Sequence, residues 1–186
     1  MNAAQDVGRF GSGKTVRRIE DPALVAGKGQ FTDDLNRPGQ THLVFIRSPY
    51  AHARIKSVDA AAAHGMPGVL AVYSGADLVA AGVQAMPSPI PFPRPDGKPG
   101  VSAPRHALGV ERVRYVGEAV AAVVAESREA AVNAAEAVQV IYDELPAVVD
   151  SVSAIAPGAP VLCNEAPDNI ASVLRHGDFD ATAAAF

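Results

Sequence analysis

Residues 113–127 hold the pattern that most constrains the fold of this chain. A basic and aromatic stretch ends at Gly117, and residues 119–125 then form a run of apolar residues. Such a run is typical of a strand that is buried on both faces. Ser127 follows as a candidate helix N-cap, with Glu129 in the first turn, where a carboxylate interacts favourably with the helix dipole. The pattern predicts a buried strand that leads into a helix ending near residue 137.

A further strand is predicted directly after this helix, at residues 138–143. Because strand, helix and strand follow one another without a break, we expect a β-α-β unit with a right-handed crossover. The helix should have one apolar face, formed by Ala131, Val132, Ala135 and Val138. This unit would form the centre of the fold.

Shorter elements are predicted upstream of residue 113. Residues 41–47, 54–59 and 69–73 are rich in apolar and β-branched residues or alternate with polar ones, which indicates strands. Asp59 can cap a short helix over residues 60–64, and the pair Ser74 and Asp77 can cap a second helix that ends at Gly82. Together the elements predict an α+β fold with a mixed sheet, short helices and the β-α-β unit.

Residues 86–104 are rich in proline, with Pro87, Pro89, Pro91, Pro93, Pro95, Pro99 and Pro104. Each proline fixes φ and removes a hydrogen-bond donor, so neither a helix nor a central strand is expected here. A loop of this length in a compact domain is either flexible or lines a functional surface. We interpret it as a surface excursion over a functional wall.

The composition excludes several classes of protein. The 186 residues are 48% hydrophobic and 19% charged, which is typical of a globular domain and not of a disordered chain or a membrane-spanning protein. The net charge of -4 gives no basic surface for nucleic acid. Cys163 is the single cysteine, so the chain cannot form an internal disulfide, an iron-sulfur cluster or a Cys-rich zinc site. We predict a cytoplasmic protein.

Residues 8–15 match the phosphate-loop pattern, with Lys14 and Thr15 at the positions that reach phosphate and magnesium. That motif needs a buried strand before it and a long helix after it. Residues 1–7 are too polar for a core strand, and Pro22 stops any helix early. We therefore interpret the match as a coincidence, and nucleotide binding at residues 8–15 stays as an alternative.

No catalytic, cofactor-binding or metal-binding residue is predicted in this chain. The histidines lack metal-ligand spacing; they are His42, His52, His64, His106 and His176. No Gly-x-Ser-x-Gly elbow places a serine as a nucleophile. The adjacent acidic pairs are expected in turns, caps or solvated edges; they are Glu20-Asp21, Asp33-Asp34 and Asp143-Glu144.

The compact part is predicted to end near residue 150. We expect an N-terminal arm at residues 1–20, a compact domain at residues 21–150 and an extended segment at residues 151–186. Asp178 or Asp180 should cap a helix that has barely begun at Phe186. An Ala-rich turn cannot bury an apolar face alone, so we expect a piece of a longer polypeptide. The alternative is a frayed chain end.

Several blocks of sequence, in this order, carry a family resemblance that covers about residues 8–180: residues 17–22, 27–34, 47–55, 66–69, 113–118, 120–125 and 142–148. They resemble the N-terminal region of the large, molybdopterin-binding subunit of the molybdenum hydroxylases. This family includes xanthine dehydrogenase, aldehyde oxidase and aerobic carbon monoxide dehydrogenase. The resemblance implies an α/β hammerhead domain.

The resemblance also implies what the chain does and does not contain. In this family, molybdopterin cytosine dinucleotide and the catalytic side chains belong to domains C-terminal to the hammerhead, and [2Fe-2S] clusters and FAD belong to partner subunits. The complete enzyme would insert water-derived oxygen into a C–H bond of a small molecule, or oxidise carbon monoxide. This chain would be an assembly domain, inactive by itself, with residues 86–104 in the wall of the substrate channel. The alternative is a stand-alone subunit that complements a separate molybdenum subunit.

Overall fold

The computed structural model describes residues 18–87 and 89–186, so the phosphate-loop match at residues 8–15 lies outside the described residues. The chain divides into two compact units, residues 1–40 and residues 41–186. In the first unit, helix α1 (Asp21–Val25) and the 3-10 helix η2 (Thr32–Asp34) contain no buried residue. The core therefore belongs to the second unit.

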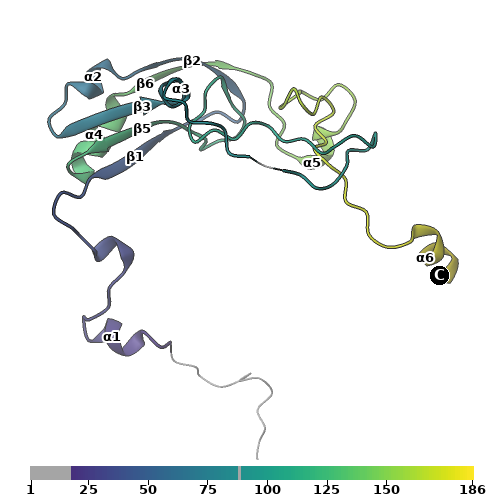
Figure 1. The fold of residues 1–186 in the computed structure, drawn as a ribbon, viewed down its shortest axis with the longest axis horizontal. Helices are drawn as coiled ribbons and strands as arrows, with labels where there is room; N and C mark the ends of the chain where they lie inside the picture. The colour runs from purple at the N-terminus through teal and green to yellow at the C-terminus, as the bar shows by residue number, and fades with distance from the viewer. Residues whose placement is uncertain (1–17, 88) are drawn as a thin grey trace, which may run out of the picture. The chain divides into compact units, whose positions relative to one another are not determined.

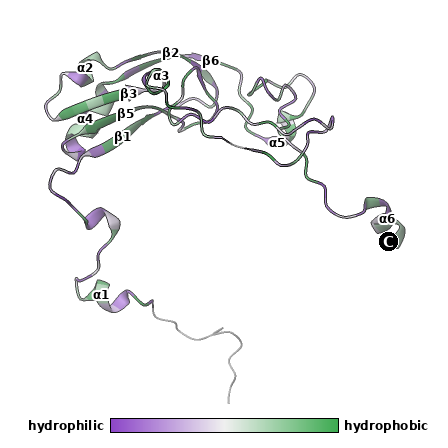
Figure 2. Cartoon of the chain, in the orientation of Figure 1, coloured by the Kyte–Doolittle hydropathy of each residue, from purple (hydrophilic) through white to green (hydrophobic). Residues whose placement is uncertain are grey.

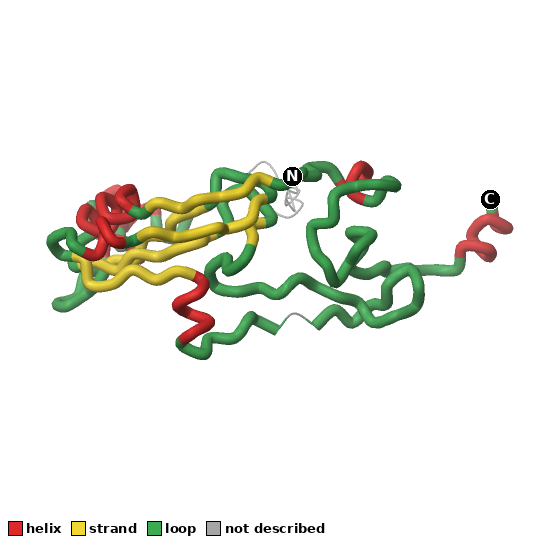
Figure 3. Tube along the Cα trace, turned by 90° about the horizontal axis from the view of Figure 1, so that it is seen from above, coloured by secondary structure: helices red, strands yellow, loops and turns green. Residues whose placement is uncertain are grey.

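Two three-stranded sheets form the second unit, and all of their pairings are antiparallel (Figures 1 and 3). Sheet A has the order β1 (His42–Arg47), β5 (Ala119–Ala125), β3 (Val69–Ser74). Sheet B has the order β4 (Arg112–Val113), β2 (Ala53–Asp59), β6 (Gln139–Glu144). The predicted strands are confirmed to within a residue or two, whereas the two-residue strand β4 was not predicted.

Five helices accompany the sheets: α2 (Ala61–His64), α3 (Gly75–Ala80), α4 (Arg128–Ala137), α5 (Ser151–Ala154) and α6 (Phe179–Ala185). The caps predicted at Ser127 and Ser74 are confirmed, because Ser127 Oγ accepts a hydrogen bond from the Ala130 amide at 3.1 Å and Ser74 with Asp77 forms a capping box. The predicted cap at Asp59 is shifted by one residue: Ala60 is the N-cap residue of α2, and Asp59 Oδ1 accepts from the Ala61 amide at 2.9 Å. Helix α3 ends at Ala80, two residues before the predicted Gly82. Asp178 caps α6. None of the helices in residues 18–87 and 89–186 is long and apolar enough to cross a membrane.

The predicted crossover within one mixed sheet is wrong, although the α+β class is right. Strand β5 pairs with β1 on one side and β3 on the other, so both of its edges are taken. Strand β6 instead pairs with β2 in sheet B. Helix α4 thus carries the chain from one sheet to the other, and among the described strands no parallel pair exists.

Helix α4 packs on one face of sheet A. Ala131 and Ala134 of α4 are fully buried and join a core cluster with Val123 of β5. The predicted apolar face was wrong for Val132, which is 37% exposed. Positions 131, 134 and 138 follow the helical period of three to four residues, and Val132 lies one position off it. Small alanine side chains let the helix approach the sheet closely.

A second core cluster joins the two sheets. Val120 of β5 packs with Ala53 of β2 and Val113 of β4, and all three are fully buried. Figure 2 shows apolar residues concentrated on the strands of sheet A. The run at residues 119–125, which the sequence marked as buried on both faces, is therefore the strand that both clusters share.

Candidate functional site

The Pro-rich loop at residues 86–104 contacts the segment after residue 150. The Val101 amide donates to the Ala171 carbonyl at 3.1 Å, and the Val173 amide donates to the Pro93 carbonyl at 2.8 Å. The loop also closes on itself, since isolated bridges join Met86 to Arg105 and Pro93 to Pro99. No helix or longer strand forms in the described part of the loop, as predicted from its prolines. The loop and the C-terminal segment thus hold each other.

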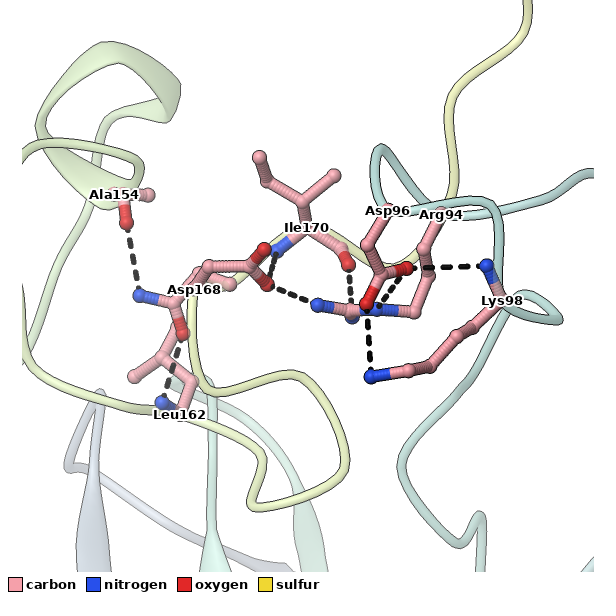
Figure 4. A network of polar contacts seen from close by, with 8 residues as sticks. Arg94, Asp96, Lys98, Ala154, Leu162, Asp168 and Ile170 are labelled. Carbon is pink, nitrogen blue, oxygen red and sulfur yellow. Dashed lines mark hydrogen bonds and ion pairs between the residues drawn. The ribbon is translucent and has the colours of Figure 1, made fainter.

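Arg94 is the centre of this contact (Figure 4). Its Nη2 lies 2.7 Å from Asp168 Oδ1, and its Nη1 donates to the Ile170 carbonyl at 2.5 Å. The Arg94 side chain is only 9% exposed, whereas its partner Asp168 is 47% exposed, so the ion pair lies at the edge of the solvent. The hydrogen bond from Arg94 holds the pKa of Asp168 below its ordinary value. The planar guanidinium of Arg94 carries several N–H donors, so it can bond the Asp168 carboxylate and the Ile170 carbonyl at the same time.

The side chain of Asn169 fixes the conformation of the C-terminal segment through hydrogen bonds to its backbone. Its Oδ1 accepts from the Leu162 amide at 3.0 Å, and its Nδ2 donates to the Ala154 and Pro160 carbonyls, both at 2.9 Å. Its φ of 57° lies in the left-handed region, which asparagine adopts more readily than most residues. One side chain therefore ties the end of helix α5 to the irregular segment at Pro160 and Leu162.

An open cavity of about 170 Å³ lies where the Pro-rich loop meets β4 and the turn at Gly117. Its lining includes His106, Arg112, Arg114 and Glu118. Glu118 Oε2 accepts from the Arg114 amide at 2.6 Å, and Arg114 Nε donates to the Leu162 carbonyl at 3.1 Å. Through these bonds Arg114 and Glu118, both in the stretch at residues 113–127, position the turn at Gly117 and the C-terminal segment.

Among the described residues, no group of three or more His, Cys, Asp or Glu side chains is placed to hold a metal ion. His106 lines the cavity, whereas His52 is buried with its Nδ1 2.7 Å from the Pro146 carbonyl oxygen.

Cys163 lies in the irregular segment after α5, where its Sγ donates to Glu165 Oε2 at 2.7 Å. Burial raises the pKa of the Cys163 thiol, and the neighbouring carboxylate opposes a thiolate further. The thiol is thus held in its protonated, weakly nucleophilic form.

The acidic pairs of the sequence act locally. Asp34 accepts from the Phe31 amide at 2.9 Å and Asp21 from the Arg18 amide at 3.2 Å. Asp143 forms a long ion pair of 3.8 Å with Lys56 across sheet B. These contacts are turns and a solvated edge, as the sequence predicted.

Arg94 and Asn169 were not predicted from the sequence. Arg94 lies between prolines without a pattern of its own, and its partners are 74 and 76 positions away. Asn169 follows a proline and an aspartate, which indicates a turn but not its three side-chain hydrogen bonds. Distances between remote segments are not readable from one sequence.

The two antiparallel sheets and the helix that joins them define an α/β hammerhead domain. Residues 26–146 match the family model described as "Aldehyde oxidase and xanthine dehydrogenase, a/b hammerhead domain". The chain belongs to this family. This finding confirms the family that the sequence blocks indicated.

Three relatives illustrate the similarity. The chain is 42% identical over 85% of its length to the nicotine 6-hydroxylase large subunit of Paenarthrobacter nicotinovorans, of which it covers 18%. It is 32% identical over 79% of its length to the xanthine dehydrogenase molybdenum-binding subunit of Escherichia coli O157:H7, of which it covers 19%. The solved structure of reconstituted CO dehydrogenase from Oligotropha carboxidovorans matches 80% of the chain with a TM-score of 0.63 and 38% identity, and 17% of that structure's chain is covered. The chain thus spans about a fifth of the relatives that it matches.

Proposed function

We propose that this chain is the hammerhead domain of a molybdenum hydroxylase large subunit, and that it supports the assembly of the cofactor-binding domains. The complete protein would be an oxidoreductase that acts on a small molecule. The observation that carries this proposal is the family match over residues 26–146, together with relatives named as oxidoreductases and, in one case, as a molybdenum-binding subunit.

The proposal assigns the cofactors and partners to other parts of the enzyme. Molybdopterin cytosine dinucleotide would be held by domains C-terminal to this one, and [2Fe-2S] clusters and FAD by partner subunits. The proposal keeps the domain boundaries of the sequence analysis, an arm at residues 1–20, the hammerhead at residues 21–150 and a connecting segment at residues 151–186. A cytoplasmic location is part of the same proposal.

We also propose that the Pro-rich loop forms part of the wall of the substrate path. Arg94, which is paired on two sides, fixes the loop against the C-terminal segment. A loop that lines the substrate path must hold one conformation. The contacts of Arg94 restrict the loop in a way that its prolines alone do not. In the complete enzyme, Arg94→Ala should lower kcat/KM while the molybdenum content stays unchanged. Lys98→Ala, at an exposed neighbour, is the matched control.

Metal and pterin analysis of the complete polypeptide tests the main proposal. The complete subunit, purified with its partner subunits, should contain molybdenum and a pterin, whereas residues 1–186 alone should contain neither. Stoichiometric molybdenum on the 186-residue chain would place the site within it and overturn the proposal. A complete subunit without molybdenum would overturn it equally.

A further inference from the structure

One face of sheet A is apolar, and its large side chains on the two edge strands are exposed, whereas the small Ala122 at its centre is buried. Helix α4 packs on the face that carries Val44, Val72 and Val123. Residues that lie directly opposite each other in antiparallel strands share a face of the sheet. Ala122 is opposite Phe45 on one side and opposite Tyr73 on the other, so these three residues lie together on the face that α4 does not cover. We call this outer face the apolar strip, and it consists of Leu43, Phe45, Ala71, Tyr73, Ala122 and Val124.

The large side chains of the strip are exposed. Leu43 is 53% exposed, Phe45 is 42% exposed and Tyr73 is 44% exposed. They come from the two edge strands, β1 and β3, and flank the central strand β5. A contiguous apolar surface of this kind on a folded domain marks an interaction site more often than scattered exposed residues do.

The outer face of sheet B shows that this exposure is not a general property of the domain. Its strand positions carry Arg54, Lys56, Asp59, Gln139 and Asp143, with one ion pair between Lys56 and Asp143. Ile141 is the exposed apolar exception, at 51%. Sheet B thus has the alternation expected of a face in water, whereas sheet A is apolar on both faces. The outer face of sheet B therefore suits contact with water, and the outer face of sheet A suits contact with an apolar surface.

The size of the strip and the length of the relatives indicate what covers it. A stable association of separate chains buries about 1,200 to 2,000 Å², and three large side chains offer far less than that. A covalently linked neighbour needs less contact, because linkage raises its effective concentration to about the millimolar range. The chain covers only 17% to 19% of three relatives, so such neighbours form most of those polypeptides.

We propose that the apolar strip is the docking surface for the part of the same large subunit that follows residue 186, through an apolar face of that part. This inference rests on the proposed function and names the surface that the assembly uses. Arg47 borders the strip, since its guanidinium lies 5.5 Å from the Phe45 ring centre and its Nη1 donates to the Gly117 carbonyl at 2.8 Å. That contact holds the Phe45 ring in place in the uncovered domain.

Site-specific photocrosslinking in the complete subunit, purified with its partner subunits, tests this inference. A photoreactive phenylalanine analogue, benzoylphenylalanine, replaces Phe45 in one variant and Ile141 in a control variant. Both sites are exposed strand positions in the domain, so both variants should fold, and circular dichroism with molybdenum content verifies this. After irradiation, mass spectrometry locates the crosslinked peptides.

Crosslinks from position 45 to residues beyond 186 of the same polypeptide, with few or none from position 141, are the expected result. Crosslinks from position 45 to another subunit, to a second copy or to residues 1–40, or an absence of any crosslink, would overturn the inference. The molybdenum content is measured on the same samples. A sample that holds molybdenum but lacks the expected crosslink therefore refutes the docking surface while the proposed function stands.

A second readout uses the rate of thiol alkylation in Leu43→Cys and Ile141→Cys variants. In the complete subunit, Cys at position 43 should react about tenfold more slowly than Cys at position 141, because a docked surface reacts only when it opens. In the 186-residue chain the two rates should be similar. Equal rates in the complete subunit, or slow reaction at position 43 in the short chain, would contradict the docking of a following segment.

Discussion

Arg94 and Asp168 lie 74 positions apart in the sequence, and their side chains meet at 2.7 Å. The contact joins a loop that prolines keep free of regular structure to a segment that follows the last strand. Neither segment has a hydrophobic core of its own among the fully buried residues. Polar contacts therefore decide the conformation of this part of the domain.

Removing the Arg94 side chain should loosen the loop. Arg94→Ala deletes a charged donor to the Ile170 carbonyl, and such a bond contributes about 1.5 to 3 kcal/mol. Local opening should become about ten- to a hundredfold more frequent. Hydrogen exchange at the Val101 and Val173 amides reports this directly, since both bond across the same contact. Lys98→Ala should leave these rates unchanged, and unchanged rates in Arg94→Ala would contradict the role of Arg94.

Substitutions of Asn169 should rank by how much of its role they remove. Asn169→Gly keeps the left-handed backbone and loses the three side-chain bonds, which should cost about 2 to 3 kcal/mol of local stability. Asn169→Ala should cost about 1 kcal/mol more, because alanine disfavours this φ. Exchange of the Leu162 amide and proteolysis near residue 160 measure both. An equal loss for Gly and Ala would show that the backbone conformation is not under strain.

Gly75 at the start of α3 packs against the backbone of Gly109. A Cβ at position 75 would lie 2.8 Å from the Gly109 carbonyl carbon and 2.9 Å from the Leu108 oxygen, so backbone would have to move. Gly75→Ala should therefore lower the free energy of unfolding by about 1 to 3 kcal/mol, as overpacking does. Gly65→Ala is the control, because its Cβ would meet only one atom, at 3.8 Å. Urea denaturation compares the two, and similar midpoints would contradict the tight approach.

The cap of α3 should weaken in acid. Hydrogen bonds from the Ser74 side chain and amide hold the pKa of Asp77 below its ordinary value of 3.8. A lowered pKa means that this stabilisation is complete at higher pH and is lost as the pH falls below 3.8 through the folded value. Carboxyl NMR titration should show Asp77 titrating below 3.8, and Ser74→Ala should move it back up. An Asp77 that titrates normally in the wild-type chain would refute the cap.

The Tyr142 hydroxyl is buried, and within residues 18–87 and 89–186 it has no hydrogen-bond partner. Burial raises the pKa of Tyr142, and the nearby Ser48 hydroxyl, which also bonds the Tyr50 backbone, opposes this shift. Tyr142→Phe should therefore raise the free energy of unfolding by about 1 kcal/mol. Ser48→Ala should lower it, since two bonds are lost. Destabilisation by Tyr142→Phe would mean that the hydroxyl is paired.

Much of the local structure could be predicted. The run at residues 119–125 is a buried strand, Ser127 and Ser74 cap helices, and the helix after Ser127 ends at Ala137. These features depend on neighbours within a few residues, so their signals lie in short stretches of sequence. The ordered blocks of the family also lie in such stretches, and the comparison with known proteins confirmed them.

The pairing of the strands could not be predicted in the same way. A strand, a helix and a strand in succession favour parallel pairing of the two strands. Here β1 and β3 occupy both edges of β5, so β6 pairs in sheet B instead. The candidate site depended on the same kind of information, since Arg94 finds its partners only after the chain has folded. The exposure of Phe45 and Tyr73 likewise follows from which face α4 covers.

The sequence by itself determined the class of the fold, most of the element boundaries and the family, because periodicity, caps and motif order are properties of short segments. Only the tertiary structure decided the two antiparallel sheets, the Arg94 and Asn169 contacts and the apolar strip. These depend on which edges and faces remain free once other segments have packed. That competition between remote parts of the chain is settled by the folded state as a whole.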